Sequence, residues 1–162
     1  MIILLSPEDQ ALVMEEIRYV VLGTNQGNRS RDQHIFDSHR GLVGEACEAY
    51  YQGGRVEFKA WLDRRFKLRH VMHDPGWDVC GRDVKTKKKT DRAFLVTRSD
   101  KKPRPLNGYV GWEIVNDKHG TACGGIRFGE FSDEDVGMLI GIGLEGVWAD
   151  SLIPAVQDSN SE

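Results

Sequence analysis

Apolar residues recur at three- and four-residue steps through the first part of the chain, which is the spacing of an α-helix. Between 6 and 22 they form one stripe, made up of Leu12, Val13, Ile17, Val20 and Val21. Ser6-Pro7 followed by two acidic residues is typical of a helix start, because the hydroxyl accepts a free backbone N–H and proline has none to leave unpaired. The pattern predicts a helix over 6–22 that ends before Gly23.

The following stretch loses this periodicity and then regains it. Residues 24–38 are polar and contain glycine, which predicts a loop. A second helix is predicted over 39–51 and is closed by Gly53-Gly54, with Glu45 and Glu48 one turn apart on it. Residues 55–72 fit either a helix or a strand, and the pattern leaves both open.

The second half of the chain contains short β-rich runs. WDV, RDVK, AFLVT and YVGWEIV, at 77–79, 82–85, 93–97 and 109–115, are separated by turn-forming residues, which predicts a meander. Further on, Ser132 before three acidic residues indicates another helix start, although the glycines that follow weaken that helix. The four tryptophans are predicted to be core anchors, and residues 156–162 a frayed tail.

Composition narrows the class of protein. The chain has 162 residues, of which 40% are hydrophobic and 29% charged, so a single globular domain over 1–162 is expected. The opening MIILL has no basic residue before it and fits neither a signal peptide nor a membrane span, which predicts a cytoplasmic protein with no membrane partner. Three widely spaced cysteines suit reduced thiols better than a disulfide framework.

Charge is distributed unevenly along the chain. The formal net charge is −3, yet residues 82–92 hold six basic and two acidic side chains, a net charge of +4. Such a local excess of positive charge points to a polyanionic partner that is met at one place.

The same segment pairs this positive charge with two aspartates. If Cys80-Gly81 forms a tight hairpin turn, Val79 lies opposite Arg82, Asp78 opposite Asp83 and Trp77 opposite Val84, with Lys85 on the face of Asp83. Like charges directly opposite each other are destabilising unless a cation lies between them. Carboxylate oxygens suit a hard cation, so the hairpin predicts a site for Mg²⁺ or Mn²⁺.

A cation beside a lysine and a basic run has a use in cleaving phosphodiesters. The metal would polarise the phosphoryl group, and the lysine would position the attacking water or offset negative charge. The basic side chains that follow are predicted to hold the nucleic-acid backbone: Lys87, Lys88, Lys89 and Arg92.

The D-x-x-x-x-D-V-K pattern at 78–85 resembles the catalytic core of the PD-(D/E)xK, or restriction-endonuclease-like, nucleases. The stretch GLVGEA at 41–46 resembles the helix of that family that carries a glutamate, and FLVTRSDKKPRPLNGYVGWEI at 94–114 looks like its later strands. The resemblance covers about residues 39–115, with 1–38 as an N-terminal helix and loop.

This resemblance implies an α/β fold with a restriction-endonuclease-like core, in which helices flank a mixed central β-sheet. It implies Glu45 as the helix acid, Asp78 and Asp83 as further metal ligands and Lys85 as the catalytic lysine. The implied function is Mg²⁺- or Mn²⁺-dependent hydrolysis of DNA by a small nuclease of phage or prokaryotic type. The four-residue spacing between the two aspartates is short for the family, which leaves Asp74 as an alternative first ligand.

Other interpretations remain open. The chain could be an inactive member of the same fold that binds nucleic acid or protein. It could also be a zinc-stabilised binding domain built on His70, His73 and Cys80. The glycine-rich run GMLIGIGLEGVW at 137–148 fits either the surface of a homodimer or a packed core segment.

Overall fold

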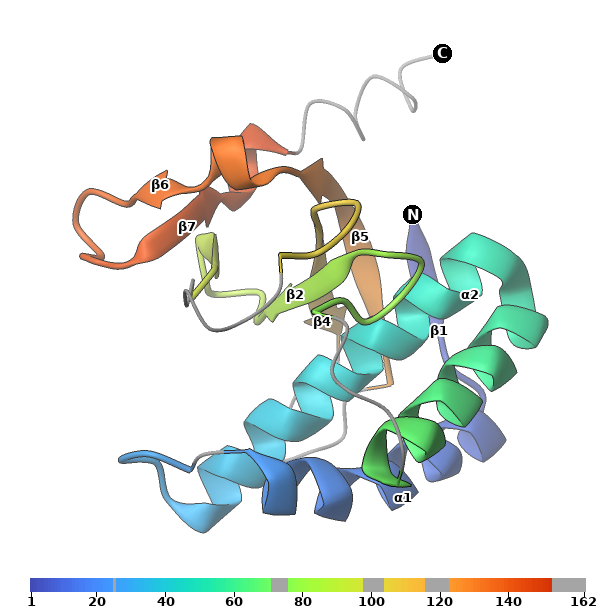
Figure 1. Cartoon of the computed structure of the whole chain (residues 1–162). Coiled ribbons are helices and arrows are strands. Elements are labelled where there is room, and N and C mark those ends of the chain that lie inside the picture. The colour runs from blue at the N-terminus through green and yellow to red at the C-terminus, as the bar shows by residue number, and fades with distance from the viewer. Residues whose placement is uncertain (25, 71–75, 98–103, 116–122, 153–162) are drawn as a thin grey trace.

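The computed structural model describes residues 1–24, 26–70, 76–97, 104–115 and 123–152 (Figure 1). Its helices and strands, in chain order, are β1 (Ile2–Leu4), α1 (Pro7–Gly23), α2 (Arg31–His70), β2 (Asp83–Lys87), β3 (Ala93–Leu95), β4 (Tyr109–Val115), β5 (Gly124–Phe131), β6 (Gly137–Met138) and β7 (Glu145–Trp148). Single 3₁₀ turns at Asp133–Asp135 and Ala149–Ser151 flank the last strands. The chain is a mixed α/β protein, as the sequence predicts.

Helix α1 confirms the predicted N-terminal helix. Ser6 Oγ accepts the N–H of Asp9 at 3.2 Å, and Pro7 occupies the first turn. None of the helices in the described part of the chain is both long and apolar enough to cross a membrane.

Helix α2 begins at Arg31, so the loop predicted over 24–38 is wrong for its second half. Two inward-facing residues of this helix are histidines, His34 and His39, each no more than 3% exposed. Histidine counts as a polar residue in the apolar pattern, so the stripe is interrupted at two positions where the helix is buried. The start of the helix is capped by Ser30, whose Oγ accepts the N–H of Gln33 at 3.1 Å.

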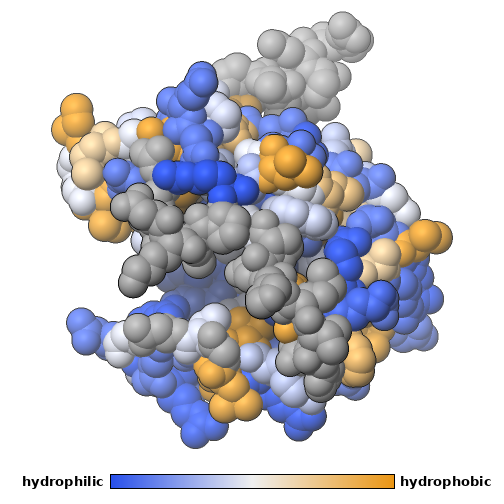
Figure 2. Space-filling model, viewed as in Figure 1, coloured by the Kyte–Doolittle hydropathy of each residue, from blue (hydrophilic) through white to orange (hydrophobic). Residues whose placement is uncertain are grey.

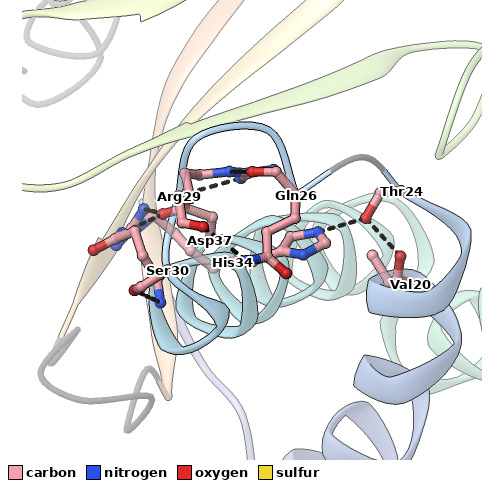
Figure 3. A network of polar contacts seen from close by, with 9 residues as sticks. Val20, Thr24, Gln26, Arg29, Ser30, His34 and Asp37 are labelled. Carbon is pink, nitrogen blue, oxygen red and sulfur yellow. Dashed lines mark hydrogen bonds and ion pairs between the residues drawn. The ribbon is translucent and has the colours of Figure 1, made fainter.

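A polar network joins this helix start to the end of α1 (Figure 3). The Thr24 hydroxyl donates to the carbonyl of Val20 at 2.7 Å, so its oxygen is left to accept from His34 Nε2 at 2.8 Å. Asp37 accepts from Arg29 at 2.9 Å. Burial opposes ionisation of Asp37. Hydrogen bonds from Arg29, Gln33 and Arg40 outweigh this effect and lower the pKa of Asp37. These contacts tie Thr24 to both helices and Arg29 to α2.

Helix α2 is broken in its middle. Gly53 and Gly54 have non-helical dihedrals, with φ of 64° at Gly54, a left-handed conformation that favours glycine. The second half of α2 doubles back beside the first half (Figure 1), and the Tyr50 ring stacks on Phe58 at 5.0 Å across the break. The predicted stop at Gly53-Gly54 is confirmed, and residues 55–70 form a helix; 71 and 72 lie outside the described residues.

The strands form two sheets. The first has the strand order β1-β5-β4-β2, in which β2 is parallel to β4 and the other neighbours are antiparallel. The second has the order β3-β7-β6. The predicted meander is wrong, because β3 leaves the first sheet to pair with β7 and the chain returns to β2 in the parallel direction.

The two faces of the first sheet are covered differently. Helices α1 and α2 lie on one side of it, and β3, β6 and β7 lie away from the helices (Figure 1). Trp61 and Trp112 are buried in the cluster between the helices and the sheet, whereas Phe94 and Tyr109 belong to a second cluster with the short sheet. Of the four tryptophans predicted as core anchors, these two are fully buried and the other two are half-buried.

The C-terminal segment forms no long helix. Ser132 and Asp135 make the expected capping box, but it closes a single 3₁₀ turn that gives way to β6. The β6–β7 hairpin exposes apolar side chains at its outer end (Figure 2), namely Met138, Ile140, Ile142 and Leu144. The outer part of 137–148 is therefore not a packed core segment, and a homodimer through it stays a prediction. The predicted frayed tail at 156–162 lies outside the described residues.

Candidate functional site

The predicted turn at Cys80-Gly81 is present. Cys80 has φ of 50° and Gly81 φ of 79°, the positive pair that a two-residue hairpin turn needs. Val79 and Arg82 pair across it, with N···O distances of 2.9 and 3.1 Å. Asn107 holds the turn from outside, since its side chain donates to the Cys80 carbonyl at 2.9 Å and its N–H to the Gly81 carbonyl at 2.7 Å.

The hairpin stops after that single pair. The N–H of Asp78 donates to the same Arg82 carbonyl at 2.8 Å, and the N–H of Asp83 turns to Gly108 at 3.0 Å. The predicted cross-strand pairs Asp78–Asp83 and Trp77–Val84 are therefore wrong, because β2 leaves the hairpin to pair with β4.

Asp78 reaches β2 through its side chain instead. Its Oδ2 accepts the N–H of Val84 at 2.9 Å, and the charge of Asp83 acts on its carboxyl group. Burial of the carboxyl group raises the pKa of Asp78 well above its usual range, and the charges of Glu45 and Asp83 raise it further. The two aspartates therefore come together as the hypothesis requires, through the side chain of Asp78 instead of a cross-strand pair.

Glu45 joins this pair from α2. Its Oε1 accepts from Trp61 Nε1 at 3.1 Å and from Arg65 Nη1 at 3.2 Å. Burial raises the pKa of Glu45 and the charge of Asp83 adds to this, while Arg65 and Trp61 act in the opposite direction.

The neighbouring Glu48 has a different role. It is fully buried and accepts from Trp112 Nε1 at 2.9 Å and Arg127 Nε at 2.8 Å. Those two partners lie on β4 and β5, so Glu48 ties the helix to the sheet. Of the two glutamates one turn apart, only Glu45 lies with the aspartates.

Gly44 explains how Glu45 comes to lie beside β2. A Cβ at Gly44 would lie less than 3.0 Å from the γ-methyl group of Thr86, closer than real side chains approach. At Gly41, the other glycine of the GLVGEA stretch, nothing lies within 4 Å of the added atom. Gly44 is therefore a position of close approach between α2 and β2, one residue before the glutamate.

Two protein cations neutralise the carboxylates. Lys85 Nζ lies 3.1 Å from Asp83 Oδ2, with both side chains about one quarter exposed, which confirms that the two residues share a face of β2. On the helix side, Arg65 contacts Glu45 and lies 3.5 Å from Glu16 of α1. Burial alone would lower the pKa of Arg65, and the charges of Glu45, Glu16 and Asp78 raise it instead.

Arg65 and Glu16 were not predicted as site residues. Arg65 lies in the stretch that fits either helix or strand, and it reaches Glu45 only because α2 doubles back at Gly54. Glu16 lies on the first helix and joins the site through its contact with Arg65. No local pattern in the sequence marks either residue.

The basic run divides in two. Lys87 is 4% exposed, its Nζ lies 2.7 Å from Glu113 Oε1 and 4.9 Å from the Phe128 ring centroid, so its predicted contact with a nucleic-acid backbone is wrong. Strand alternation points it into the second cluster, where a buried cation needs such partners. The remaining basic residues are exposed after the end of β2, namely Lys88, Lys89 and Arg92.

Several predicted ligands lie outside the described residues. They are Asp74 and His73, together with the side chain of His70. The alternative first metal ligand and the zinc site on His70, His73 and Cys80 therefore stay predictions. The Cys80 thiol lies 3.8 Å from Glu57 Oε1, and burial with that acidic neighbour raises its pKa.

The donor chemistry of the cluster suits a hard divalent cation, because Glu45, Asp78 and Asp83 supply only carboxylate oxygens, and the charge of Asp83 raises the pKa of both other groups. Within the described ranges, no three His, Cys, Asp or Glu side chains stand as a ready-formed metal-binding group. Comparisons with protein-family models, curated proteins and solved structures found no match to this chain.

Proposed function

We propose that this protein is a metal-dependent nuclease that hydrolyses phosphodiester bonds in DNA. The supporting observation is the convergence of three carboxylates from separate segments with one lysine. Glu45 comes from α2, Asp78 from the turn before β2, and Asp83 and Lys85 from β2 itself. Burial and the charges of Glu45 and Asp83 raise the pKa of Asp78, and burial and the charge of Asp83 raise the pKa of Glu45. Perturbed carboxyl groups gathered at one place are typical of a functional site.

The proposed roles follow from these positions. Asp78, Asp83 and Glu45 would hold Mg²⁺ or Mn²⁺, which supplies the polarisation of the phosphoryl group and a more acidic water when it is bound. Lys85 lies 3.1 Å from Asp83 and one quarter exposed, where its ammonium group can hold the attacking water or offset charge on the phosphate.

A restriction-endonuclease-like core is part of the proposal. A helix that carries Glu45 packs on a mixed sheet whose strand β2 carries Asp83 and Lys85, in the order that the resemblance implies. The departure lies before β2, where the first acidic position, Asp78, precedes the single Val79–Arg82 bridge instead of lying on a strand.

DNA would lie along β2. The exposed residues Lys88, Lys89 and Arg92 follow the end of the strand opposite to Asp83, and five residues of strand span about 17 Å. A duplex backbone that runs from the carboxylates to these side chains would place more than one phosphate within reach of positive charge.

Purified protein incubated with supercoiled and linear DNA, with Mg²⁺, with Mn²⁺ or with EDTA, tests the proposal. We expect metal-dependent cleavage that Asp83→Asn and Lys85→Ala each reduce by about 100-fold or more. Asp63→Asn is the matched control, because Asp63 is an exposed acid on α2 whose partner is the surface residue Lys67. Cleavage by both variants at the wild-type rate would refute the assigned site.

One observation favours the inactive binding module as a second candidate. The ion pairs Lys85–Asp83 and Arg65–Glu45 satisfy the cluster with the protein's own charges. Such a module would bind DNA in EDTA and retain that binding in Asp83→Asn, with no cleavage of supercoiled, linear, branched or single-stranded substrates in either metal.

A further inference from the structure

The two oxygens of the Glu45 carboxylate have different surroundings. Both hydrogen bonds that it accepts from the described part of the chain end on Oε1, from Trp61 Nε1 at 3.1 Å and Arg65 Nη1 at 3.2 Å. A carboxylate held by one oxygen keeps a fixed plane and leaves its second oxygen for another partner.

Both donors come from the second half of α2 and are themselves fixed. Trp61 and Arg65 are one helical turn apart, and the guanidinium group lies 5.9 Å from the indole ring centroid. Trp61 is 1% exposed and packs on Phe58, whose ring lies 5.8 Å away. Arg65 is held from its other side by Glu16 at 3.5 Å. The two donors therefore reach Glu45 from a rigid helical hairpin.

We propose that Trp61 and Arg65 are positioning residues, which orient Glu45 through Oε1 so that Oε2 serves the divalent cation shared with Asp78 and Asp83. This inference rests on the proposed nuclease function, because it assumes a cation at the cluster. Hydrogen-bonded neighbours of metal ligands contribute about 10- to 100-fold to metal affinity in other proteins.

Arg65 has an alternative role with the opposite consequence. As a positive charge beside the cluster, it would repel a divalent cation, and its removal would tighten metal binding. Trp61 carries no charge, so a change at Trp61 reports on orientation alone. The sign of the effect at Arg65 then separates the two roles.

The test measures Mn²⁺ binding to the full chain without DNA, by electron paramagnetic resonance of free Mn²⁺ or by calorimetry, and then the Mn²⁺ dependence of cleavage. Trp61→Phe is expected to raise the dissociation constant for Mn²⁺ about 10-fold or more, with kcat at saturating Mn²⁺ close to wild type. Arg65→Gln is expected to weaken binding as well, and Arg65→Lys to restore part of it.

The chain offers a matched control for the indole hydrogen bond. Trp112 is also buried and also donates its Nε1 to a glutamate, Glu48, at 2.9 Å. Trp112→Phe removes the same kind of bond from the neighbouring glutamate, and we expect it to lower stability while leaving the affinity for Mn²⁺ unchanged. Circular dichroism and thermal unfolding show which variants are folded. If Trp61→Phe does not fold, the affinity of Arg65→Lys for Mn²⁺, compared with that of Arg65→Gln, still tests the inference.

The outcomes separate this inference from the proposed function. If the wild type binds Mn²⁺ and cleaves DNA, but Trp61→Phe and Trp112→Phe have equal effects on affinity or Arg65→Gln binds Mn²⁺ more tightly, the positioning role is overturned and the nuclease stands. If the wild type neither binds Mn²⁺ nor cleaves any substrate, both are overturned.

Discussion

The close approach of Gly44 on α2 to β2 matters both for the stability of the fold and for the position of Glu45 in the candidate site. Gly44→Ala adds one methyl group to α2 within 3.0 Å of the γ-methyl of Thr86, 3.4 Å from Val84 Cγ1 and 3.7 Å from Ile114 Cδ1. The last two distances are ordinary or nearly so, and the first requires movement. We therefore expect the helix and β2 to move apart at this point.

The magnitude follows from two opposing effects. Alanine is favoured over glycine inside a helix by about 1 kcal/mol. Overpacking by one methyl group in a well-packed region costs about 1–3 kcal/mol. Gly41→Ala gains the first effect without the second, because nothing lies within 4 Å of the added atom. The stability of Gly44→Ala should accordingly fall about 1–3 kcal/mol below that of Gly41→Ala.

Urea unfolding followed by circular dichroism gives both free energies by linear extrapolation. Thr86→Ser deletes the opposing methyl group, so the double variant Gly44→Ala/Thr86→Ser should recover most of the loss and show a favourable coupling of about 1–3 kcal/mol. DNA cleavage by Gly44→Ala should also fall, since Glu45 moves with the helix. If Gly44→Ala is as stable as Gly41→Ala, the close approach of α2 to β2 is wrong.

Three further predictions concern the buried charges. Glu48→Gln should lower the free energy of unfolding by about 3 kcal/mol or more, because Arg127 would lose its buried carboxylate partner. Chemical denaturation measures this change, and a loss below about 1 kcal/mol would contradict the prediction. Lys88→Gln should reduce the slope of the logarithm of DNA affinity against the logarithm of salt concentration by about one unit. Lys87→Gln should leave this slope unchanged and lower the free energy of unfolding by about 3 kcal/mol, because Lys87 is buried against Glu113. Equal slopes for the two variants would refute the distinction. Asp78→Asn should abolish cleavage yet stabilise the protein at pH 8 by about 1 kcal/mol, after allowance for partial exposure. Because the pKa of Asp78 is raised by folding, the carboxyl destabilises the fold progressively as the pH rises from its unfolded pKa through its folded pKa, and asparagine removes this loss; urea unfolding at pH 4 and pH 8 should show a gain at pH 8 only.

The sequence predicts best the features that depend on a few consecutive residues. The cap at Ser6, the stop at Gly53-Gly54 and the turn at Cys80-Gly81 are each determined by the hydrogen-bonding or dihedral preference of the residues present, and all three are found. The failures concern choices between distant partners. The pairing of β2 with β4 depends on where β3 goes, and no local pattern in 77–97 states that β3 joins β7.

The inward direction of Lys87 is a failure of a different kind. Its position after Asp83 and Lys85 gives it the same strand parity, and its predicted contact with nucleic acid requires that face to be exposed along its whole length. The face is open only at the start of β2, because Phe94 and Phe128 cover its end. A run of lysines therefore does not show how far along a strand the solvent reaches.

The candidate site was accessible to sequence analysis because most of it is local. Asp78, Asp83 and Lys85 lie within eight residues of one another, so a tight turn and the two-residue period of a strand are enough to bring them together, even though the ladder that was expected between the aspartates is absent. Glu45 is the long-range member. The sequence marks it only through the preceding Gly44, whose small size lets the helix approach β2. No neighbouring residue marks Arg65 in this way, since its contact with Glu45 depends on how α2 doubles back at Gly53-Gly54. Residues that bind directly can thus be inferred from short patterns, whereas those that orient them require the packing of whole helices.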